Sequence, residues 1–345
     1  MKELLADKSI EELKAVLAAY DEKPYRALQL FECINLGKNW DEMTTIGKAL
    51  KERLSEQYDA VGVRVVEKLV SKDGTTKYLF GLRDGNVVEG VVMRYHYGNT
   101  ICISTQVGCR MNCAFCASGI DGLVRNLSAG EMLGEVVAAN RDFEGDLKMR
   151  AITNVVLMGS GEPMDNYENV AKFLHLLSDE KGLNISLRNV SLSTCGVVPG
   201  VDRLISDKLW VTLTFSLHAP FDAIRSELMP VNKAYPICEI IGAAKRYFEA
   251  SGRRVIFEYT LIKDKNDTDA CAEALAKLVK GFPTHVNLIV LNYVKEKGLK
   301  ASARDRAKEF LAILEKQGVS ATIRRTMGAD IEGACGQLRR KYIGN

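Results

Sequence analysis

The apolar positions of the first 60 residues recur with the period of an amphipathic helix. In SIEELKAVLAAY they lie three and four positions apart, and Ser9 precedes Glu12 by three residues, the capping-box arrangement of a helix start. YRALQLFECINL and TTIGKALKERLSEQY have the same period. We therefore expect residues 1–60 to form a small helical accessory domain.

The pattern changes to a period of two at residue 61. VGVRVVEKLV, TKYLFGL and NVVEGVVMRYHY alternate like strands, and the sequences between them, KDG and RDG, are typical of hairpin turns. These strands predict a β-hairpin extension over residues 61–98.

Apolar strands alternate with amphipathic helices over the rest of the chain, residues 99–345. The strands are NTICISTQ, AITNVVLMG, NVSLSTCG, LWVTLTFSLH, RVIFEYTLI, HVNLIVLN and SATIR. Strands that alternate with helices form a parallel sheet, and six or seven such units indicate a complete or partial (β/α) barrel. The predicted fold class is therefore α/β. In such barrels the functional side chains lie at the carboxyl ends of the strands.

The composition and the first residues predict the cellular compartment of the protein. Hydrophobic residues make up 47% and charged residues 26% of the 345 positions, which is ordinary for a globular enzyme. No apolar run approaches the roughly 18 residues of a membrane span, and the start, MKELLADKSI, is charged where a signal peptide has an apolar core. We predict a cytoplasmic protein with no membrane partner. In that reducing compartment the nine cysteines indicate ligands or catalytic thiols before disulfides.

Charge is distributed unevenly along the chain. The net charge is +3, but residues 295–345 hold 12 Lys and Arg against 6 Asp and Glu. This basic end fits either a solvated surface or a polyanionic partner.

Three cysteines lie within eight residues, at Cys109, Cys113 and Cys116 in QVGCRMNCAFCASG. The spacing lets three thiolates converge from one loop. A cubane iron–sulfur cluster takes four ligands, so three cysteines leave one iron open for a substrate. The alternatives are a structural zinc, for which Cys102 is the nearest fourth thiol, and a coincidence of buried thiols.

Further polar motifs follow the ends of other predicted strands. GSGEP contains Gly161 and Glu162, Ser193 ends NVSLS, and Asn292 ends HVNLIVLN. The strand LWVTLTFSLH ends in Ser216, Leu217 and His218. We expect all of these residues to lie on the same rim of the barrel as the three cysteines. Four other cysteines in apolar or helical contexts are predicted to be inert interior thiols: Cys33, Cys195, Cys238 and Cys271.

The motifs together resemble those of a known family. The spacing C-x3-C-x2-C, with Phe115 before the last cysteine, is the signature of radical S-adenosylmethionine (SAM) enzymes. QVGCRMNCAFCASG, GSGEP, LSTCGVVPG, FSLHAP, LMPVNKAYPI and GADIEGACGQLR resemble the RlmN/Cfr family of RNA adenosine methyltransferases, and the RlmN branch most. The resemblance covers nearly the whole chain. It implies a partial barrel of the radical SAM type.

The resemblance also implies the cofactors. Cys109, Cys113 and Cys116 would hold a 4Fe-4S cluster whose open iron binds SAM, and an electron would cleave SAM to a 5′-deoxyadenosyl radical. Gly161 and Glu162 would orient the SAM amino group. The remaining residues would hold the ribose and carboxylate of SAM: Ser193, Ser216, Leu217, His218 and Asn292.

The same resemblance assigns a second set of residues to catalysis. Cys335 would take a methyl group from one SAM and carry it to the adenine. Cys102 would release the product by forming a disulfide with Cys335. Glu89 matches the proton-transfer carboxylate of the family, although a glutamate on an edge strand can also simply point to solvent. Cys335 can also be read as a small buried residue.

The implied partners are 23S rRNA, in the peptidyl-transferase centre, and tRNA, at the adenosine beside the anticodon. A flavodoxin-type donor would supply the electron, and we expect a monomer. Methylation at carbon 2 of the adenosine is the leading hypothesis. One alternative is methylation at carbon 8, as in the antibiotic-resistance branch, and the other is a non-catalytic iron–sulfur or zinc RNA-binding module.

Overall fold

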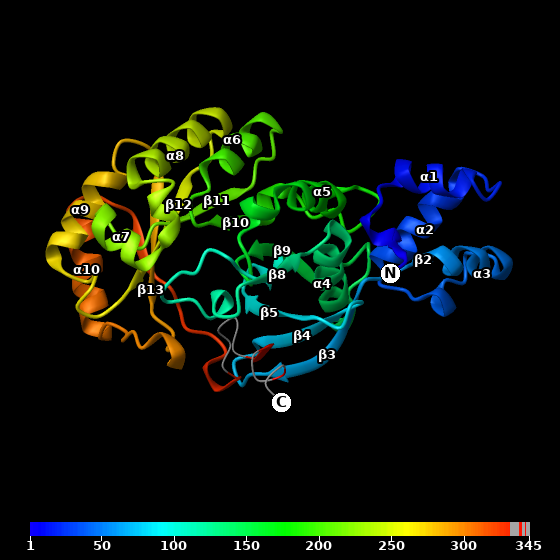
Figure 1. Ribbon diagram of the computed structural model, residues 1–345, viewed down its shortest axis with the longest axis horizontal. Coiled ribbons are helices and arrows are strands. Elements are labelled where there is room, and N and C mark those ends of the chain that lie inside the picture. Colours follow the sequence, from blue (N-terminus) through cyan, green and yellow to red (C-terminus); the bar gives the residue numbers. More distant parts are fainter. Residues whose placement is uncertain (332–337, 340–341, 343–345) are drawn as a thin grey trace.

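The computed structural model describes residues 1–331, 338–339 and 342. Within these residues the dominant feature is a ten-stranded sheet with the order β14-β13-β12-β11-β10-β9-β6-β5-β4-β3 (Figure 1). Seven of these strands, β6 and β9 to β14, run parallel to one another, and the sheet stays open because β14 and β3 end it without pairing to each other. The predicted α/β partial barrel is confirmed.

The parallel strands form because their sequences are rich in β-branched and aromatic residues that are buried on both faces. Leu213, Thr214 and Phe215, three consecutive residues of one strand whose side chains alternate between the two faces, are all fully buried, for example. The bounds are β6 (Gly98–Ile103), β9 (Ile152–Leu157), β10 (Val190–Thr194), β11 (Thr212–Ser216), β12 (Val255–Leu261), β13 (Thr284–Val290) and β14 (Ala321–Ile323).

Helices follow these strands and lie on the outer side of the sheet (Figure 1). Their bounds are α4 (Ala129–Asp142), α5 (Tyr167–Ser178), α6 (Val198–Ser206), α7 (Asp222–Leu228), α8 (Ile237–Ser251), α9 (Asp269–Val279) and α10 (Arg304–Lys316). In the described part of the chain, none of the helices has the length and apolar character that a membrane crossing needs.

Three antiparallel strands extend the sheet beyond β6. They are β3 (Val63–Val70), β4 (Thr76–Leu82) and β5 (Val87–Tyr95), and β5 pairs with β6. Every residue of β4 is buried. The predicted strands therefore exist, and they continue the sheet of the barrel.

The N-terminal residues form α1 (Ile10–Ala18), α2 (Tyr25–Asn35) and α3 (Lys48–Gln57), together with the short parallel pair β1 (Glu3–Leu4) and β2 (Tyr58–Asp59). The capping box of Ser9 and Glu12 is present at the start of α1.

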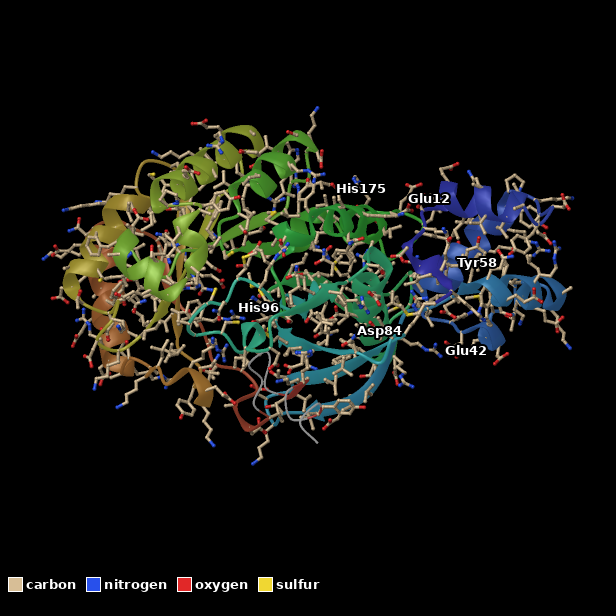
Figure 2. All side chains as sticks on the ribbon, in the orientation of Figure 1. Glu12, Glu42, Tyr58, Asp84, His96 and His175 are labelled. Atoms are coloured by element: carbon tan, nitrogen blue, oxygen red, sulfur yellow. The ribbon has the colours of Figure 1, made fainter. Side chains whose placement is uncertain are left out.

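Several polar contacts join this helical region to the barrel. Asp7 accepts a hydrogen bond from the backbone N–H of Gly130 at 2.6 Å. Glu12, which lies next to α5 in Figure 2, pairs with Lys172 at 2.8 Å. Glu42 accepts a hydrogen bond from Arg141 at 3.1 Å. The helices thus contact α4 and α5, and they lie far along the long axis from α9 and α10 (Figure 1).

Candidate active site

A cavity of about 360 Å³ lies at the carboxyl ends of the parallel strands. Val91 and Met93 of the antiparallel strands and residues 324–327 also line it, and Met327 packs against Val91 and Met93. Nine of the residues singled out in the sequence line it together: Cys102, Cys109, Cys113, Cys116, Gly161, Glu162, Ser193, Ser216 and His218. Asn292 also reaches this cavity, from an exposed position after β13.

The loop that carries the three clustered cysteines is closed by a short antiparallel pair, β7 (Gln106–Gly108) and β8 (Leu123–Asn126). Gly108 has φ +78°, and a Cβ there would lie 2.0 Å from the carbonyl oxygen of Gly122. The next residue, Cys109, donates its N–H to the same carbonyl at 2.9 Å. The first cysteine is therefore fixed by a turn that requires glycine.

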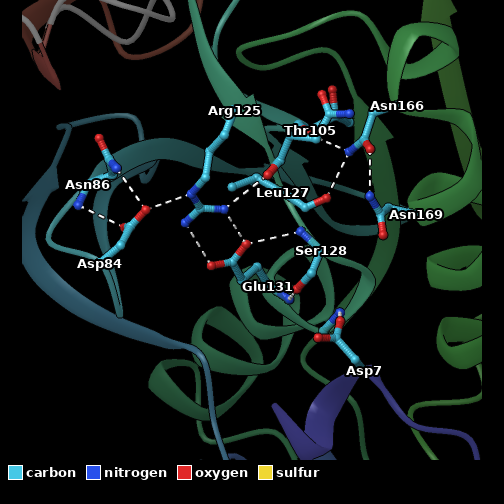
Figure 3. Close-up of polar contacts among 12 residues, drawn as sticks. Asp7, Asp84, Asn86, Thr105, Arg125, Leu127, Ser128, Glu131, Asn166 and Asn169 are labelled. Atoms are coloured by element: carbon cyan, nitrogen blue, oxygen red, sulfur yellow. Dashed lines mark hydrogen bonds and ion pairs between the residues drawn. The ribbon is translucent and has the colours of Figure 1, made fainter. Parts of the chain in front are cut away.

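Arg125 anchors the base of this loop (Figure 3). Its guanidinium binds Asp84, in the turn between β4 and β5, at 2.6 Å, and both oxygens of Glu131 on α4 at 2.8 and 2.9 Å. These two carboxylates raise the pKa of Arg125. Because the guanidinium joins three elements in a bidentate geometry, the loop has a rigid base.

The three thiols are close enough to affect one another. Burial, and the neighbouring Cys116 next, raise the pKa of Cys109 to about 12, and the same causes raise the pKa of Cys113. Metal binding requires thiolates, so a bound cation would replace these protons. Within the described residues no three Cys, His, Asp or Glu side chains are grouped so that they could hold a single metal ion. The donor set, three thiols of one rigid loop facing a cavity, fits an iron–sulfur cluster with one open position.

The turn after β9 contributes Gly161 and Glu162. Gly161 has φ +109°, and a Cβ there would lie 2.7 Å from side-chain atoms of Gln106 and Thr105. Glu162 accepts hydrogen bonds from the N–H groups of Cys195 at 2.7 Å and Met164 at 3.0 Å. Burial raises its pKa. The carboxyl group is therefore held in one orientation at the cavity wall.

A row of polar side chains crosses the next three strand ends. The hydroxyl oxygens of Ser193 and Ser216 lie 3.3 Å apart, and Ser193 donates to Glu258 at 3.1 Å. Arg324 lies 3.8 Å from the other oxygen of Glu258. Both Glu258 and Arg324 line the cavity, and sequence reasoning missed them. The signal for Glu258 was a single acidic residue inside the apolar strand VIFEYTL.

His218 is buried and has φ +56°. Its Nδ1 accepts a hydrogen bond from the N–H of Thr260 at 2.9 Å, and the edge of its ring contacts Phe115. Burial, together with the charge of Arg225, lowers its pKa to about 3. The imidazole is thus neutral at physiological pH and forms part of the wall. The Leu217 side chain packs in the main core, so only its backbone faces the site's loops.

Cys102 lies on β6 opposite Val91 of β5, inside the same cavity as the cysteine loop. Glu89, two positions before Val91, is buried and pairs with the buried Lys77 at 3.1 Å. It also accepts a hydrogen bond from the N–H of Arg339 at 2.6 Å. The alternative in which Glu89 points to solvent is therefore wrong. Cys335 lies outside the described residues.

The four thiols predicted to be interior do not behave alike. Cys33 and Cys271 are buried in the core, as expected. Cys195 is buried too, but it lines the cavity beside Glu162. Cys238 is exposed, so the prediction was wrong there. It is the second residue of α8 and lies on the outer face of that helix. Its apolar neighbours in the sequence had indicated a buried position.

The fold and the cysteine loop define a class. Residues 103–279 match the family model of the radical SAM superfamily, whose members use SAM with an iron–sulfur cluster. A radical SAM methyltransferase from Sphaerobacter thermophilus has a similar crystal structure, with a TM-score of 0.93 and 43% identity over 97% of this chain and 98% of that one. The chain is therefore a radical SAM enzyme.

Two further comparisons identify the family within the radical SAM enzymes. Residues 4–59 match the ribosomal RNA large subunit methyltransferase N-terminal domain. Relatives from Lachnoclostridium phytofermentans and Alkaliphilus oremlandii, each named probable dual-specificity RNA methyltransferase RlmN, are 48% identical. The matches cover 97% and 98% of this chain and 93% and 97% of the relatives. The chain belongs to the RlmN family, which confirms the resemblance read from its motifs.

Proposed function

We propose that the protein methylates carbon 2 of adenosine in two RNA substrates, 23S rRNA and tRNA, through a methylated cysteine. The relatives' name, dual-specificity RNA methyltransferase, supports two RNA substrates. The observation that carries the proposal is the single cavity, which brings Cys102 together with the cysteine loop and the strand-end residues. A structural zinc could use Cys102 as its fourth ligand, but a zinc module would not need the strand-end residues that line the same cavity.

This cavity supports the proposed cofactor residues. Cys109, Cys113 and Cys116 hold the 4Fe-4S cluster, and the strand-end residues that line the cavity hold SAM: Gly161, Glu162, Ser193, Ser216, His218 and Asn292. Leu217 contributes through its backbone, because its side chain packs in the core. When bound, the two groups supply one-electron chemistry, which a weakly nucleophilic carbon of adenine requires. The chain's own part is to orient SAM and to keep water out, with Met93 and Met158 forming apolar wall.

Three residues act on the RNA. Of these, Cys102 lines the cavity, and Glu89 lies on β5 two positions before the lining residue Val91. Cys335 carries the methyl group to the adenine. Cys102 then attacks the sulfur of Cys335, so that the disulfide forms as the bond between this sulfur and the transferred carbon breaks, with SAM as the two-electron oxidant. Glu89 accepts the proton that the adenine carbon loses. Lys77 lies 3.1 Å from Glu89 and holds its carboxylate in place. Leu338 packs on Leu79 and Val87, so the described residues that follow Cys335 contact the strand of Glu89.

Recognition of RNA is divided among the three parts of the chain. The helical domain of residues 1–60 and the basic residues after 295 contact phosphates, residues 61–98 support Glu89, and the barrel of residues 99–345 receives the target base, drawn out of its stack. A flavodoxin-type donor reduces the cluster. The protein acts as a monomer in the cytoplasm.

Mass spectrometry of nucleosides tests the proposal. Purified enzyme, reconstituted without oxygen and supplied with SAM and reductant, is incubated with rRNA and tRNA fragments. We expect 2-methyladenosine in both. Mainly 8-methyladenosine would place the chain in the other branch, and no methylation with no SAM cleavage would favour the non-catalytic module. A Cys113→Ala enzyme is the control for background methylation.

A further inference from the structure

Arg225 is the largest fully buried side chain in the described residues, with 0% exposure. It belongs to the short helix α7, which follows the β11 end of the cavity. Arginine is almost never fully buried unless its charge is paired. No described carboxylate forms a hydrogen bond with this guanidinium, so its position needs another explanation.

The guanidinium joins the ends of two strands instead. It donates to the carbonyl oxygens of Cys195 at 2.7 Å, Ser216 at 3.0 Å and Leu217 at 3.0 Å. A fourth hydrogen bond, at 2.9 Å, goes to the side chain of Asn232. Cys195 follows β10, whereas Ser216 ends β11, so one rigid fork sets the distance between the two loops.

The helix of Arg225 is also joined to the cysteine loop. Leu228, its last residue, accepts a hydrogen bond from the N–H of Ala114 at 2.8 Å. Leu228 and Met229 pack against Cys113 and Phe115 in one apolar cluster. The helix therefore lies between the loop of the three cysteines and the strand ends with the proposed SAM contacts.

Burying a guanidinium has a cost that apolar packing would avoid. Burial lowers the pKa of Arg225 to about 10, so the group remains charged at neutral pH. What arginine provides and an apolar residue cannot is a planar fork with five fixed donors. This favours a geometric role over a stabilising one.

We propose that Arg225 is a positioning residue that fixes the SAM-contact loops relative to the cysteine loop. It acts through the backbone of Cys195, Ser216 and Leu217. This inference rests on the proposed function, because the loops matter only if they hold SAM.

Arg253 provides a matched control at the opposite ends of the same strands. It donates to the carbonyl oxygens of Trp210 at 2.7 Å and Arg188 at 3.4 Å and to the hydroxyl of Thr212 at 3.2 Å. These residues precede or begin β10 and β11. Arg253 thus makes the same kind of cross-link, but far from the cavity.

The test compares Arg225→Met, Arg225→Lys and Arg253→Met as reconstituted holoenzymes. We measure iron content, the Kd for SAM by equilibrium dialysis, the change in the cluster's EPR signal on adding SAM, and separate KM values for SAM and RNA. Arg225→Met should keep its iron but raise the Kd and KM for SAM about tenfold or more, with the KM for RNA unchanged, because misplaced loops weaken only the SAM contacts. The EPR change should be reduced.

Arg225→Lys should restore the charge but only part of the SAM affinity, since an ammonium cannot span three carbonyls. Arg253→Met should bind SAM like the wild type. The inference is overturned if Arg225→Met folds and binds SAM with wild-type affinity, or if Arg253→Met weakens binding as much. Should Arg225→Met fail to fold, Asn232→Ala, which removes one bond of the fork, must still raise the Kd. A wild-type enzyme that cleaves no SAM would instead refute the proposed function.

Discussion

The two ends of the parallel strands are held by similar means and serve different purposes. At the carboxyl ends Arg225 is fully buried and joins loops that line the cavity, whereas at the amino ends the half-buried Arg253 joins loops that do not line it. The energetic contribution of the two cross-links can be similar. What differs is that geometry at the carboxyl end must suit a ligand, while the amino end only stabilises the fold.

Buried polar side chains also distinguish the two ends of the parallel strands. Glu162, Ser193, His218 and Glu258 all lie at the carboxyl rim, with little exposure and strong hydrogen bonds to the backbone or to each other. Burying such groups is unfavourable for folding unless they are satisfied. Substitutions at this rim should therefore change activity more than stability, and substitutions at the other rim should do the reverse.

The largest effect is expected for Cys113→Ala. Three thiols hold the cluster, and removal of one should abolish most iron binding and all SAM cleavage. Iron analysis and detection of 5′-deoxyadenosine measure the two losses. Cys33→Ala, a buried thiol in α2, is the matched control and should retain both. Full iron content and undiminished SAM cleavage in Cys113→Ala would contradict the assignment of the cysteine loop as the cluster site.

Cys102→Ala should start the reaction and stop before release, because the thiol proposed to take Cys335 from the product is missing. A denaturing gel of labelled RNA should show a protein–RNA band that is absent from Cys335→Ala and from the double variant Cys102→Ala, Cys113→Ala. If Cys102 is only a packing residue, its loss should cost about 1–3 kcal/mol of stability and leave turnover complete, with no shifted band.

His218 should make the fold sensitive to acid. Its pKa is about 3 in the folded protein against an ordinary 6.5, so between these values the unfolded chain binds more protons and stability falls as pH falls. The slope from this group is at most about 1.4 kcal/mol per pH unit. His218→Gln should flatten the decline measured by urea unfolding from pH 7 to pH 4.5. His175→Gln, on the exposed face of α5, should change nothing. Equal slopes in the wild type and His218→Gln would contradict the neutral, buried imidazole.

The smallest effect is expected for Arg253→Met. It removes three hydrogen bonds at a half-buried site and should lower the unfolding free energy by about 1–3 kcal/mol. Turnover at a temperature well below unfolding should match the wild type. A large loss of kcat with unchanged stability would show that the two ends of the strands are not functionally distinct.

Much of this architecture could be predicted from the sequence because its signals are local. The alternation of apolar strands with helices predicts the partial barrel, whose sheet is open. The same pattern predicts one shared rim for the residues at the ends of its strands, namely Cys109, Glu162, Ser193 and His218, and these residues line one cavity. These residues are adjacent to Gly, Ser or Pro motifs that mark strand ends. Their convergence follows from topology alone.

The remaining site residues depend on contacts between distant segments. Lys77 reads as an exposed position of an alternating strand, yet it is buried against Glu89. Arg225 in AIRSEL resembles an ordinary surface position of a helix, and only the meeting of α7 with two strand ends buries it. The prediction for Cys238 was wrong in the opposite sense, because this thiol was expected in the interior and is exposed. Apolar neighbours in the sequence do not ensure that a residue faces the core.

The unclosed sheet has a consequence for handling the protein. An open barrel has two edges, and an exposed edge can pair with another chain and begin aggregation. The β14 edge has only three residues, whereas β3 has eight and a break in register between Val65 and Glu67. The charges of Arg64 and Glu67 and the bulge on β3 oppose edge-to-edge pairing. Neutralising these two side chains should make the protein precipitate during overexpression before any change in its fold or cofactor chemistry appears.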